Sequence, residues 1–268
     1  MFILNLTGVL KLQTNYPVVL DGVSIDKKPS KIASLSPGMT ENILSITNDY
    51  LLFSAISDYC DFPEEKILQI NDFSEIISST EKLSKTIRCG SFQNPHIKKI
   101  LSLKPDIIIT YGSFTQTSYK QLQTLDSVII QMKNSTTVSD FLLGYKTLCK
   151  IFLGNDNFEQ FYNSYKLDFE KSLNNLLNKT NGLDELKKTY ACLINLSGAV
   201  CTGDSFLSDL LNQVNLTNVA KDSTNFIFSF EDIIKSNPYY IIINETITDE
   251  EILSSPLAQL DAVKSQRI

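Results

Sequence analysis

The chain has 268 residues, of which 43% are hydrophobic and 20% are charged, a composition ordinary for a globular protein built as one large domain or two compact lobes. Its formal net charge of -6 and its small number of arginines, Arg88 and Arg267, count against a nucleic-acid-binding protein, which needs a basic surface. No segment reaches the ~18 apolar residues that a membrane-spanning helix needs.

The N-terminal part of the chain carries a hairpin signal followed by short strands. Asp21-Gly22 separates two apolar runs, a pattern typical of a β-hairpin. Buried strands are predicted over 31–36 and 50–56, with a helix between them. A polar loop follows the second of these strands.

Two β-branched runs, 106–112 and 127–132, are typical of parallel strands that are buried on both faces. A helix is predicted just before them over 94–103, with Asn94 as its N-cap and Pro95 in its first position. This alternation of helix and strand indicates an α/β unit with right-handed crossovers.

The middle of the chain, 138–179, shows no strand signal and contains no proline. Apolar residues at three-to-four spacing predict helices here, with a new helix after Gly154, where Asp156 and Glu159 resemble a capping pair. The second helix would have about 24 residues and a length of roughly 36 Å. A helix of that length in an α/β protein often bridges two lobes.

After Lys179 the alternation of strands and helices resumes, so the second half repeats the architecture of the first. Ser229 is the expected N-cap of one of these helices. The expected elements are strands at 189–196 and 239–244, and helices at 205–214, at 228–236 and from 249.

The cysteines include no CxxC pair, so neither a zinc motif nor a thioredoxin-type motif is expected. They are interpreted as small buried apolar side chains, although a Cys192–Cys201 disulfide stays open for an exported protein. A metal site is not expected, because His96, the single histidine, cannot supply a set of imidazole ligands. The five cysteines are Cys60, Cys89, Cys149, Cys192 and Cys201.

The chain has no GxSxG, P-loop or GxGxxG motif. Ser-His-Asp catalysis would depend wholly on His96. Acidic pairs such as Asp58 with Asp61 fall in a loop, where we expect solvated carboxylates. We therefore predict a protein that is not an enzyme and that carries no cofactor.

Six segments in the same order along nearly the whole chain carry a family resemblance: 31–46, 57–70, 90–110, 203–225, 228–244 and 257–268. Together they resemble the class III periplasmic (substrate)-binding proteins of ABC importers. The resemblance implies an α/β fold with two Rossmann-like lobes joined by a long backbone helix and a ligand cleft between them.

In this chain the resemblance implies an N-terminal lobe over 1–137, a helical linker over 138–180 and a C-terminal lobe over 181–268. The sequence ends at Ile268, before the last strand and helix of the relatives. The second lobe is therefore expected to be reduced or incomplete.

The resemblance is strongest to the cobalamin-binding members, so the expected ligand is vitamin B12 or another corrinoid. Residues 59–63 match a Tyr-x-Asp-aromatic-Pro stretch that such members often carry, and Phe92 falls where they place an aromatic residue facing the ligand. Aromatic rings suit a flat macrocycle because stacking gives a large contact area. The expected ligand-binding residues are Ser36, Pro37, Tyr59, Asp61, Phe62, Phe92, Phe226 and Phe228.

Other ligands stay open. Haem needs an axial ligand, for which Tyr59, His96 and Met39 are candidates. Haem-binding relatives often place a tyrosine directly before the proline of the loop, where this chain has Phe62. A ferric siderophore favours a cationic cleft, for which this chain has few arginines. A cytosolic corrinoid-binding relative without a role in transport is a further alternative.

The resemblance also implies a monomer that docks on an ABC permease in the membrane through one glutamate per lobe. Glu231 matches the position in the second lobe, whereas the first-lobe counterpart is Lys98, a departure that would weaken docking to an arginine. The family works outside the cytoplasm, in the periplasm or anchored to the membrane. The start of the chain lacks the features of a signal peptide, so a cytoplasmic location also stays open.

Overall fold

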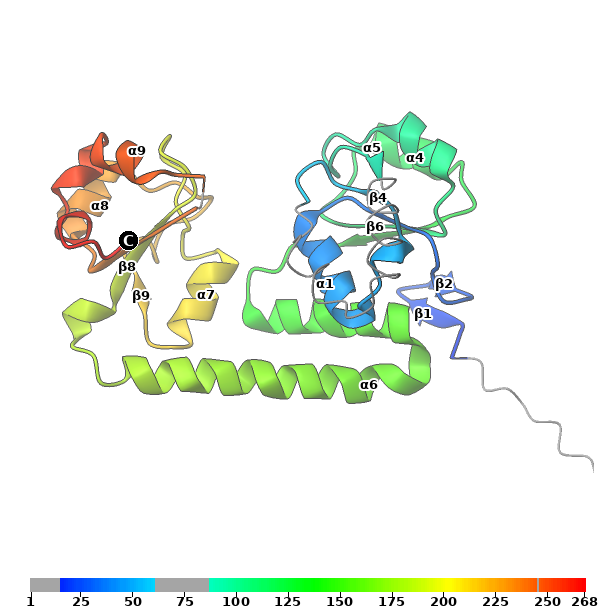
Figure 1. Cartoon of the computed structure of the whole chain (residues 1–268), viewed down its shortest axis with the longest axis horizontal. Coiled ribbons are helices and arrows are strands. Elements are labelled where there is room, and N and C mark those ends of the chain that lie inside the picture. The colour runs from blue at the N-terminus through cyan, green and yellow to red at the C-terminus, as the bar shows by residue number, and fades with distance from the viewer. Residues whose placement is uncertain (1–14, 61–86, 245) are drawn as a thin grey trace, which may run out of the picture. The chain divides into compact units, whose positions relative to one another are not determined.

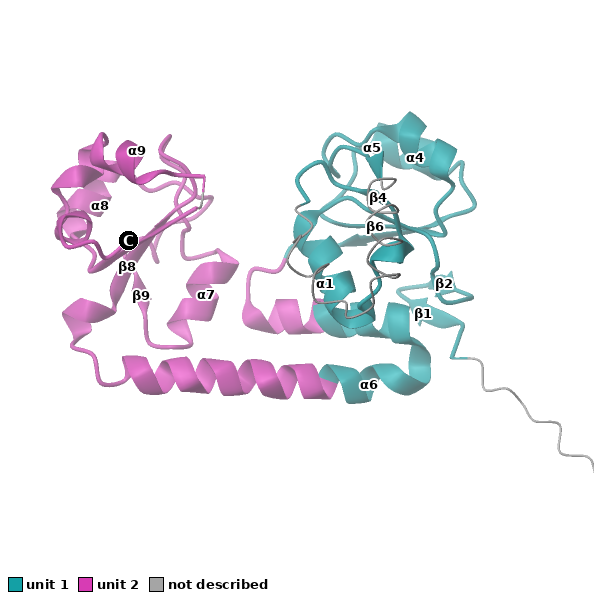
Figure 2. Ribbon diagram, viewed as in Figure 1, with its two compact units in different colours: residues 1–134, 145–162 teal, residues 135–144, 163–268 magenta. Residues whose placement is uncertain are grey.

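The structure is a computed structural model that describes residues 15–60, 87–244 and 246–268 (Figure 1). It divides into two compact units, shown in different colours in Figure 2. Unit 1 comprises Met1–Asn134 and Tyr145–Tyr162, and unit 2 comprises Ser135–Gly144 and Asn163–Ile268. Each contains a parallel β-sheet with helices, so the α/β prediction is confirmed.

Unit 1 is built on a five-stranded sheet of order β5-β4-β3-β6-β7 in which every pairing is parallel. Helices α4 and α5 lie on one side of this sheet and α1 lies on the other (Figure 1). The strands are β3 (Ile32–Ser34), β4 (Phe53–Ile56), β5 (Ile87–Arg88), β6 (Ile107–Tyr111) and β7 (Val128–Met132). The helices are α1 (Pro37–Thr47), the 3-10 turn η1 (Tyr50–Leu52), α4 (Ile97–Leu103) and α5 (Gln116–Leu122).

The predicted hairpin at the start of unit 1 is confirmed. Strands β1 (Val18–Leu20) and β2 (Val23–Ile25) pair antiparallel across a two-residue turn. Asp21 and Gly22 in that turn both have positive φ angles, 45° and 83°. Such a turn matches the right-handed twist of the strands that it joins, and Asp-Gly is among the few dipeptides that adopt it readily.

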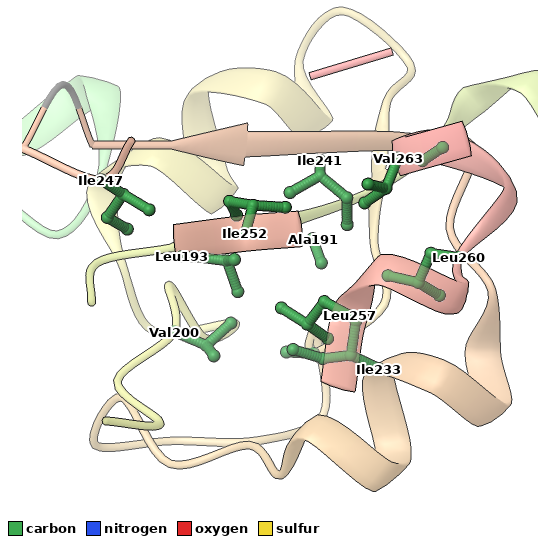
Figure 3. Packing of buried hydrophobic residues seen from close by; sticks show 12 residues of the cluster. Ala191, Leu193, Val200, Ile233, Ile241, Ile247, Ile252, Leu257, Leu260 and Val263 are labelled. Atoms are coloured by element: carbon green, nitrogen blue, oxygen red, sulfur yellow. The ribbon is translucent and has the colours of Figure 1, made fainter. Parts of the chain in front are cut away.

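Unit 2 is built on a three-stranded parallel sheet of order β10-β8-β9. Its core is a cluster of aliphatic side chains from the central strands and the helices that cover them, including Leu193, Ile241, Ile233 and Ile252 (Figure 3). The strands are β8 (Thr189–Leu193), β9 (Thr217–Asn218) and β10 (Tyr240–Ile243). The helices and 3-10 turns are η2 (Glu185–Lys188), α7 (Phe206–Asn212), α8 (Phe230–Ser236), α9 (Asp249–Leu253), η3 (Pro256–Gln259) and α10 (Asp261–Lys264).

The predicted helix break at Gly154 is confirmed. Helix α6 (Val138–Thr180) is two helical segments, because Gly154 between them has φ 78° and ψ -179°. The first amides of the second segment are capped by Asn15: its carbonyl accepts the Asn155 N–H and its side-chain oxygen accepts the Asp156 N–H, both at 3.0 Å. The cap thus comes from a residue far away in the sequence.

The chain reverses direction at this break, which side-chain contacts within unit 1 show. The Lys146 ammonium lies 3.8 Å from the Glu159 carboxylate. The same nitrogen lies 5.8 Å from the ring centre of Phe158 and 5.4 Å from that of Tyr162. An ion pair and cation–π contacts therefore hold the two segments together in unit 1.

Three predicted boundaries are each wrong by three residues, the largest differences from the structure. Residues 50–52 form the 3-10 turn η1, and β4 starts only at Phe53. The helix expected from Asn94 begins at Ile97, since Pro95 pairs with Gly90 in a β-bridge and the Asn94 carbonyl accepts the Ser91 N–H. Strand β8 ends at Leu193.

The predicted N-cap of α8 is confirmed, since the Ser229 hydroxyl accepts the Asp232 N–H at 3.0 Å. Within the ranges that the structure describes, no helix combines the length and apolar character needed to cross a bilayer.

Replacing Gly154 by alanine is expected to destabilise the protein by about 1–3 kcal/mol. An added Cβ would lie 2.5 Å from the Cβ of Asn15 at a backbone conformation that favours glycine. Gly182→Ala is the matched control, because a Cβ there meets nothing within 4 Å. Urea unfolding of both variants measures the difference, and equal free energies of unfolding would contradict this role of Gly154.

Candidate functional site

The loops that follow the strands of unit 1 lie along one edge of its sheet. Because β3, β4, β5 and β6 run parallel, their carboxyl ends meet at the same edge. Open α/β sheets bind ligands at this edge. The loop edge of unit 1 consists of residues 35–37, 57–60, 89–92 and 111–113.

Ser36 holds the first of these loops against β6. Its side chain is 7% exposed and its hydroxyl lies 2.7 Å from that of Thr110. The same oxygen accepts the Tyr111 N–H at 3.0 Å. Pro37 is exposed in the first turn of α1. Ser36 therefore positions the backbone of the loop edge, and Pro37 presents surface there.

Arg88 fastens the loop after β4. Its Nη1 donates hydrogen bonds to the carbonyls of Ser57, Asp58 and Cys60 at 3.2, 2.9 and 2.7 Å. Charge-assisted hydrogen bonds of this kind are stronger than neutral ones. The loop that they hold carries Tyr59, whose side chain is 74% exposed. The exposed ring of Tyr59 thus projects from a loop whose backbone is held by Arg88 of β5.

The loops after β4 and β5 are also joined to each other. The Asp58 carboxylate accepts the Gly90 N–H at 2.8 Å, and the Asp58 N–H donates to the Gly90 carbonyl at 2.9 Å. Asp58 is exposed, as expected for a loop carboxylate, and it also ties the two loops together. Asp61 and Phe62, also expected at this site, lie outside the described residues.

Phe92 and Tyr111 are further aromatic residues at the loop edge. The Phe92 N–H donates to the Leu35 carbonyl at 3.2 Å, and its ring lies so close to Gly112 that a Cβ there would be 2.5 Å from Cε2. The ring of Phe92 is half-buried. Sequence reasoning missed Tyr111, although an aromatic residue at the end of a buried strand and before a glycine was the available signal.

Tyr111 is held in place by its hydroxyl, which accepts a hydrogen bond from Nδ2 of Asn42 at 2.9 Å. Burial raises the pKa of this hydroxyl above its ordinary value, while the Asn42 contact opposes the shift. Tyr111 is therefore a neutral hydrogen-bonding group at physiological pH.

Unit 2 carries a second apolar loop, residues 224–228. The Phe226 N–H donates to the Thr202 hydroxyl at 3.1 Å, and its carbonyl accepts the Val200 N–H at 3.1 Å. Phe226 is 48% exposed and Ile227 74%, whereas Phe228 packs against the core of the unit. Ile227 was not predicted. Phe226 and Ile227 thus present apolar surface beside the carboxyl end of β8.

A polar cavity of about 440 Å³ lies in unit 2 beside α7 and β9. The Asp209 carboxylate at its wall accepts the Val138 N–H at 2.8 Å. None of the predicted ligand-binding residues lines it. Its lining residues are Thr136, Thr137, Gly203, Asp204, Ser208, Asp209, Asn212, Thr217, Asn218 and Lys221.

The two predicted docking residues are both exposed on helices. Glu231 lies in the first turn of α8, where a negative charge is favoured by the helix dipole. Lys98 lies on α4 beside a groove of about 620 Å³ between α4 and α5, which His96 also lines. In the part of the chain that the structure describes, no group of three or more His, Cys, Asp or Glu side chains is placed to hold a metal ion.

Arg88→Met is expected to loosen the loop 57–60, because three carbonyls lose their charged donor while the apolar stem is kept. Amide hydrogen exchange of this loop should speed up by about tenfold, with a stability loss of roughly 1–2 kcal/mol. Lys120→Met, at an exposed position of α5, is the control. Unchanged exchange in Arg88→Met would show that the loop does not depend on the guanidinium.

A family model described as "Periplasmic binding protein" matches residues 64–268. A Bacillus subtilis protein described as "Uncharacterized ABC transporter substrate-binding lipoprotein YvrC" is 23% identical over 265 residues, which cover 94% of this chain and 77% of that protein.

Several solved structures share the fold. The vitamin B12 binding protein BtuF of Vibrio cholerae has a TM-score of 0.62 at 20% identity, covering 89% of this chain and 86% of that one. The heme binding protein HutB of the same organism has a TM-score of 0.69 at 18% identity, covering 89% and 88%. The iron uptake protein PiuA of Streptococcus pneumoniae has a TM-score of 0.68 at 18% identity, covering 93% and 86%.

Proposed function

The chain belongs to the periplasmic binding protein family, and we propose that, as the substrate-binding protein of an ABC transporter, it binds cobalamin or another corrinoid. The family is one of transport proteins rather than of enzymes. The B12-binding protein among the fold relatives supports this ligand class, and the heme binding and iron uptake proteins, which have a similar degree of likeness to the chain, make haem and iron compounds the alternatives.

The observation that carries the proposal is the set of aromatic side chains on the loop edge of unit 1. Tyr59 is exposed on a loop that Arg88 and Asp58 anchor, and Phe92 and Tyr111 are partly exposed on neighbouring loops. Anchored aromatic rings offer a large contact area at small entropic cost, which suits a flat macrocycle. Asp61 and Phe62, which follow Tyr59 and Cys60 in the sequence, belong to the same proposed site.

Phe226 is proposed as the aromatic contact that unit 2 makes with the ligand, and Ile227 as an aliphatic contact beside it. Both residues are exposed, and their loop is held in place by hydrogen bonds of Phe226 with Thr202 and Val200. Phe228 packs on the core, so we assign it a supporting role. Ser36 is proposed to act through Tyr111, whose backbone it positions, and Pro37 to contact the ligand directly.

Haem is the second candidate ligand. Met39 is fully buried in α1 and is not an available axial ligand, which leaves the exposed Tyr59 and His96. His96 lies by the groove between α4 and α5, so Tyr59 is the stronger candidate. A ferric siderophore is less favoured, because the Arg88 guanidinium is already engaged with three carbonyls. A corrinoid-binding protein without a role in transport is the remaining alternative.

The proposed partner is a membrane permease, and the proposed location is outside the cytoplasm, as the lipoprotein relative suggests. Glu231 is exposed and would face a basic residue of the permease, whereas Lys98 would repel one. Glu231→Lys should therefore lower cyanocobalamin uptake by cells while leaving binding by the purified protein unchanged. A fall in binding would instead place Glu231 at the ligand, and unchanged uptake would remove it from docking.

Titration calorimetry with cyanocobalamin tests the ligand. We expect binding that Tyr59→Ala and Phe92→Ala each weaken by about tenfold, equivalent to ~1.4 kcal/mol. Leu186→Ala is the control, because Leu186 is 82% exposed on η2 and outside the proposed site. It should bind like the unchanged protein.

Hemin is titrated in parallel and followed by its absorption spectrum. If cyanocobalamin gives no heat and hemin binds, the ligand assignment changes from a corrinoid to haem. If Tyr59→Phe then abolishes hemin binding, Tyr59 is the axial ligand. Equal loss of cyanocobalamin binding in Leu186→Ala and Tyr59→Ala would contradict the placement of the site.

A further inference from the structure

Cys192 and Cys201 lie opposite each other where the chain turns back after β8. The β-bridge between Leu193 and Val200 is antiparallel, so the next residues outward, Cys192 and Cys201, face each other. The Cys201 N–H donates to the Cys192 carbonyl at 2.8 Å. Residues paired in this way have Cα atoms about 4.5–5.5 Å apart, and disulfides span roughly 4.4–6.8 Å. The backbone is therefore already arranged for a bridge.

The two sulfur atoms differ in exposure and in acidity. Cys192 is 6% exposed and Cys201 is half-buried, and both are free thiols in the structure. A hydrogen bond from the Cys192 thiol lowers the pKa of Cys201, which burial opposes and the Ser205 hydroxyl supports. The same contact, together with burial, raises the pKa of Cys192. The hydroxyl of Tyr190 lies near both thiols, and burial keeps it neutral by raising its pKa to about 12.

We propose that Cys192 and Cys201 form a redox site, a dithiol that closes to an intramolecular disulfide when the folded protein meets a small-molecule disulfide such as oxidised glutathione. Cys201 is the attacking residue, because it is the more exposed and more readily ionised of the two. Cys192 is the resolving residue. This site goes beyond the proposed transport function and does not depend on it.

The reaction balances as two exchanges. The Cys201 thiolate attacks one sulfur of oxidised glutathione, which breaks the S–S bond and releases one glutathione thiolate. Cys192 then loses its proton and attacks the Cys201 sulfur of the mixed disulfide, which releases the second glutathione. The two cysteines are oxidised, and one molecule of oxidised glutathione is reduced to two thiols. Dithiothreitol reverses both steps.

The other cysteines are not suited to this chemistry. Cys60, Cys89 and Cys149 are each at most 2% exposed. Burial raises the pKa of Cys89 to about 11 and that of Cys149 to about 12, and it also raises that of Cys60. A buried neutral thiol is a poor nucleophile. The reaction should therefore select Cys201 in the folded protein.

The bridge would restrain the apolar loop of unit 2. Thr202 follows Cys201 directly, and its hydroxyl accepts the Phe226 N–H, while the Val200 N–H donates to the Phe226 carbonyl. A covalent link at Cys201 limits local opening of this backbone. We expect amide exchange of Val200 and Phe226 to slow by at least severalfold on oxidation.

The test uses the reduced full-length protein, treated with oxidised glutathione near neutral pH and analysed by intact mass and by peptide mapping without reduction. We expect a product that has lost two hydrogens, carries no glutathione and links the peptides of Cys192 and Cys201. Cys192→Ser should stop at a glutathione adduct on Cys201. Cys201→Ser should stay unmodified at Cys192, and Cys149→Ser is the control that behaves like the unchanged protein.

A glutathione adduct that persists on Cys201 in the unchanged protein would overturn the proposal, because Cys192 would then not resolve it. No modification at either residue, in a sample whose cysteines all react after unfolding, would overturn it as well. If Cys192→Ser does not fold, the transient adduct on Cys201 in the unchanged protein, followed over time, identifies the attacking residue. A transient adduct on Cys192 would reverse the assignment.

Discussion

The parallel pairing of β3, β4, β5 and β6 is the constraint on which the proposed site depends. It brings loops that are separated in sequence to one edge of the sheet, and hydrogen bonds between the loops then fix their backbones. Arg88 and Asp58 join the loops after β4 and β5, and Ser36 joins the loop after β3 to β6. The aromatic side chains at this edge therefore project from loops whose backbones are held by hydrogen bonds.

Much of the fold follows from local sequence pattern. The β-branched run ending at Tyr111 gave a buried parallel strand, Asp21-Gly22 gave the hairpin, and Gly154 ended a helical segment. What local pattern could not supply is long-range pairing. Asn15 caps a helix about 140 residues away in sequence, and the bridge between Gly90 and Pro95 delays the start of α4.

The candidate site was predictable only in part, because it too depends on tertiary structure that local sequence pattern does not determine. Tyr59 and Phe92 were predicted from a family resemblance, and the structure places them on neighbouring loops of one sheet edge. Tyr111 and Ile227 were missed, because exposure at the end of a strand or within a loop depends on tertiary packing. Phe228 has the same side chain as Phe226 but packs on the core. Sequence alone does not distinguish these two roles.

Amide hydrogen exchange of the protein with and without cyanocobalamin tests the central claim most directly, because it reports both binding and place. The account predicts slower exchange in residues 57–60, 89–92 and 224–228, with the α7–β9 cavity unchanged. Binding of cyanocobalamin that protects the cavity residues 203–209 and leaves the loop edge of unit 1 unaffected would contradict it.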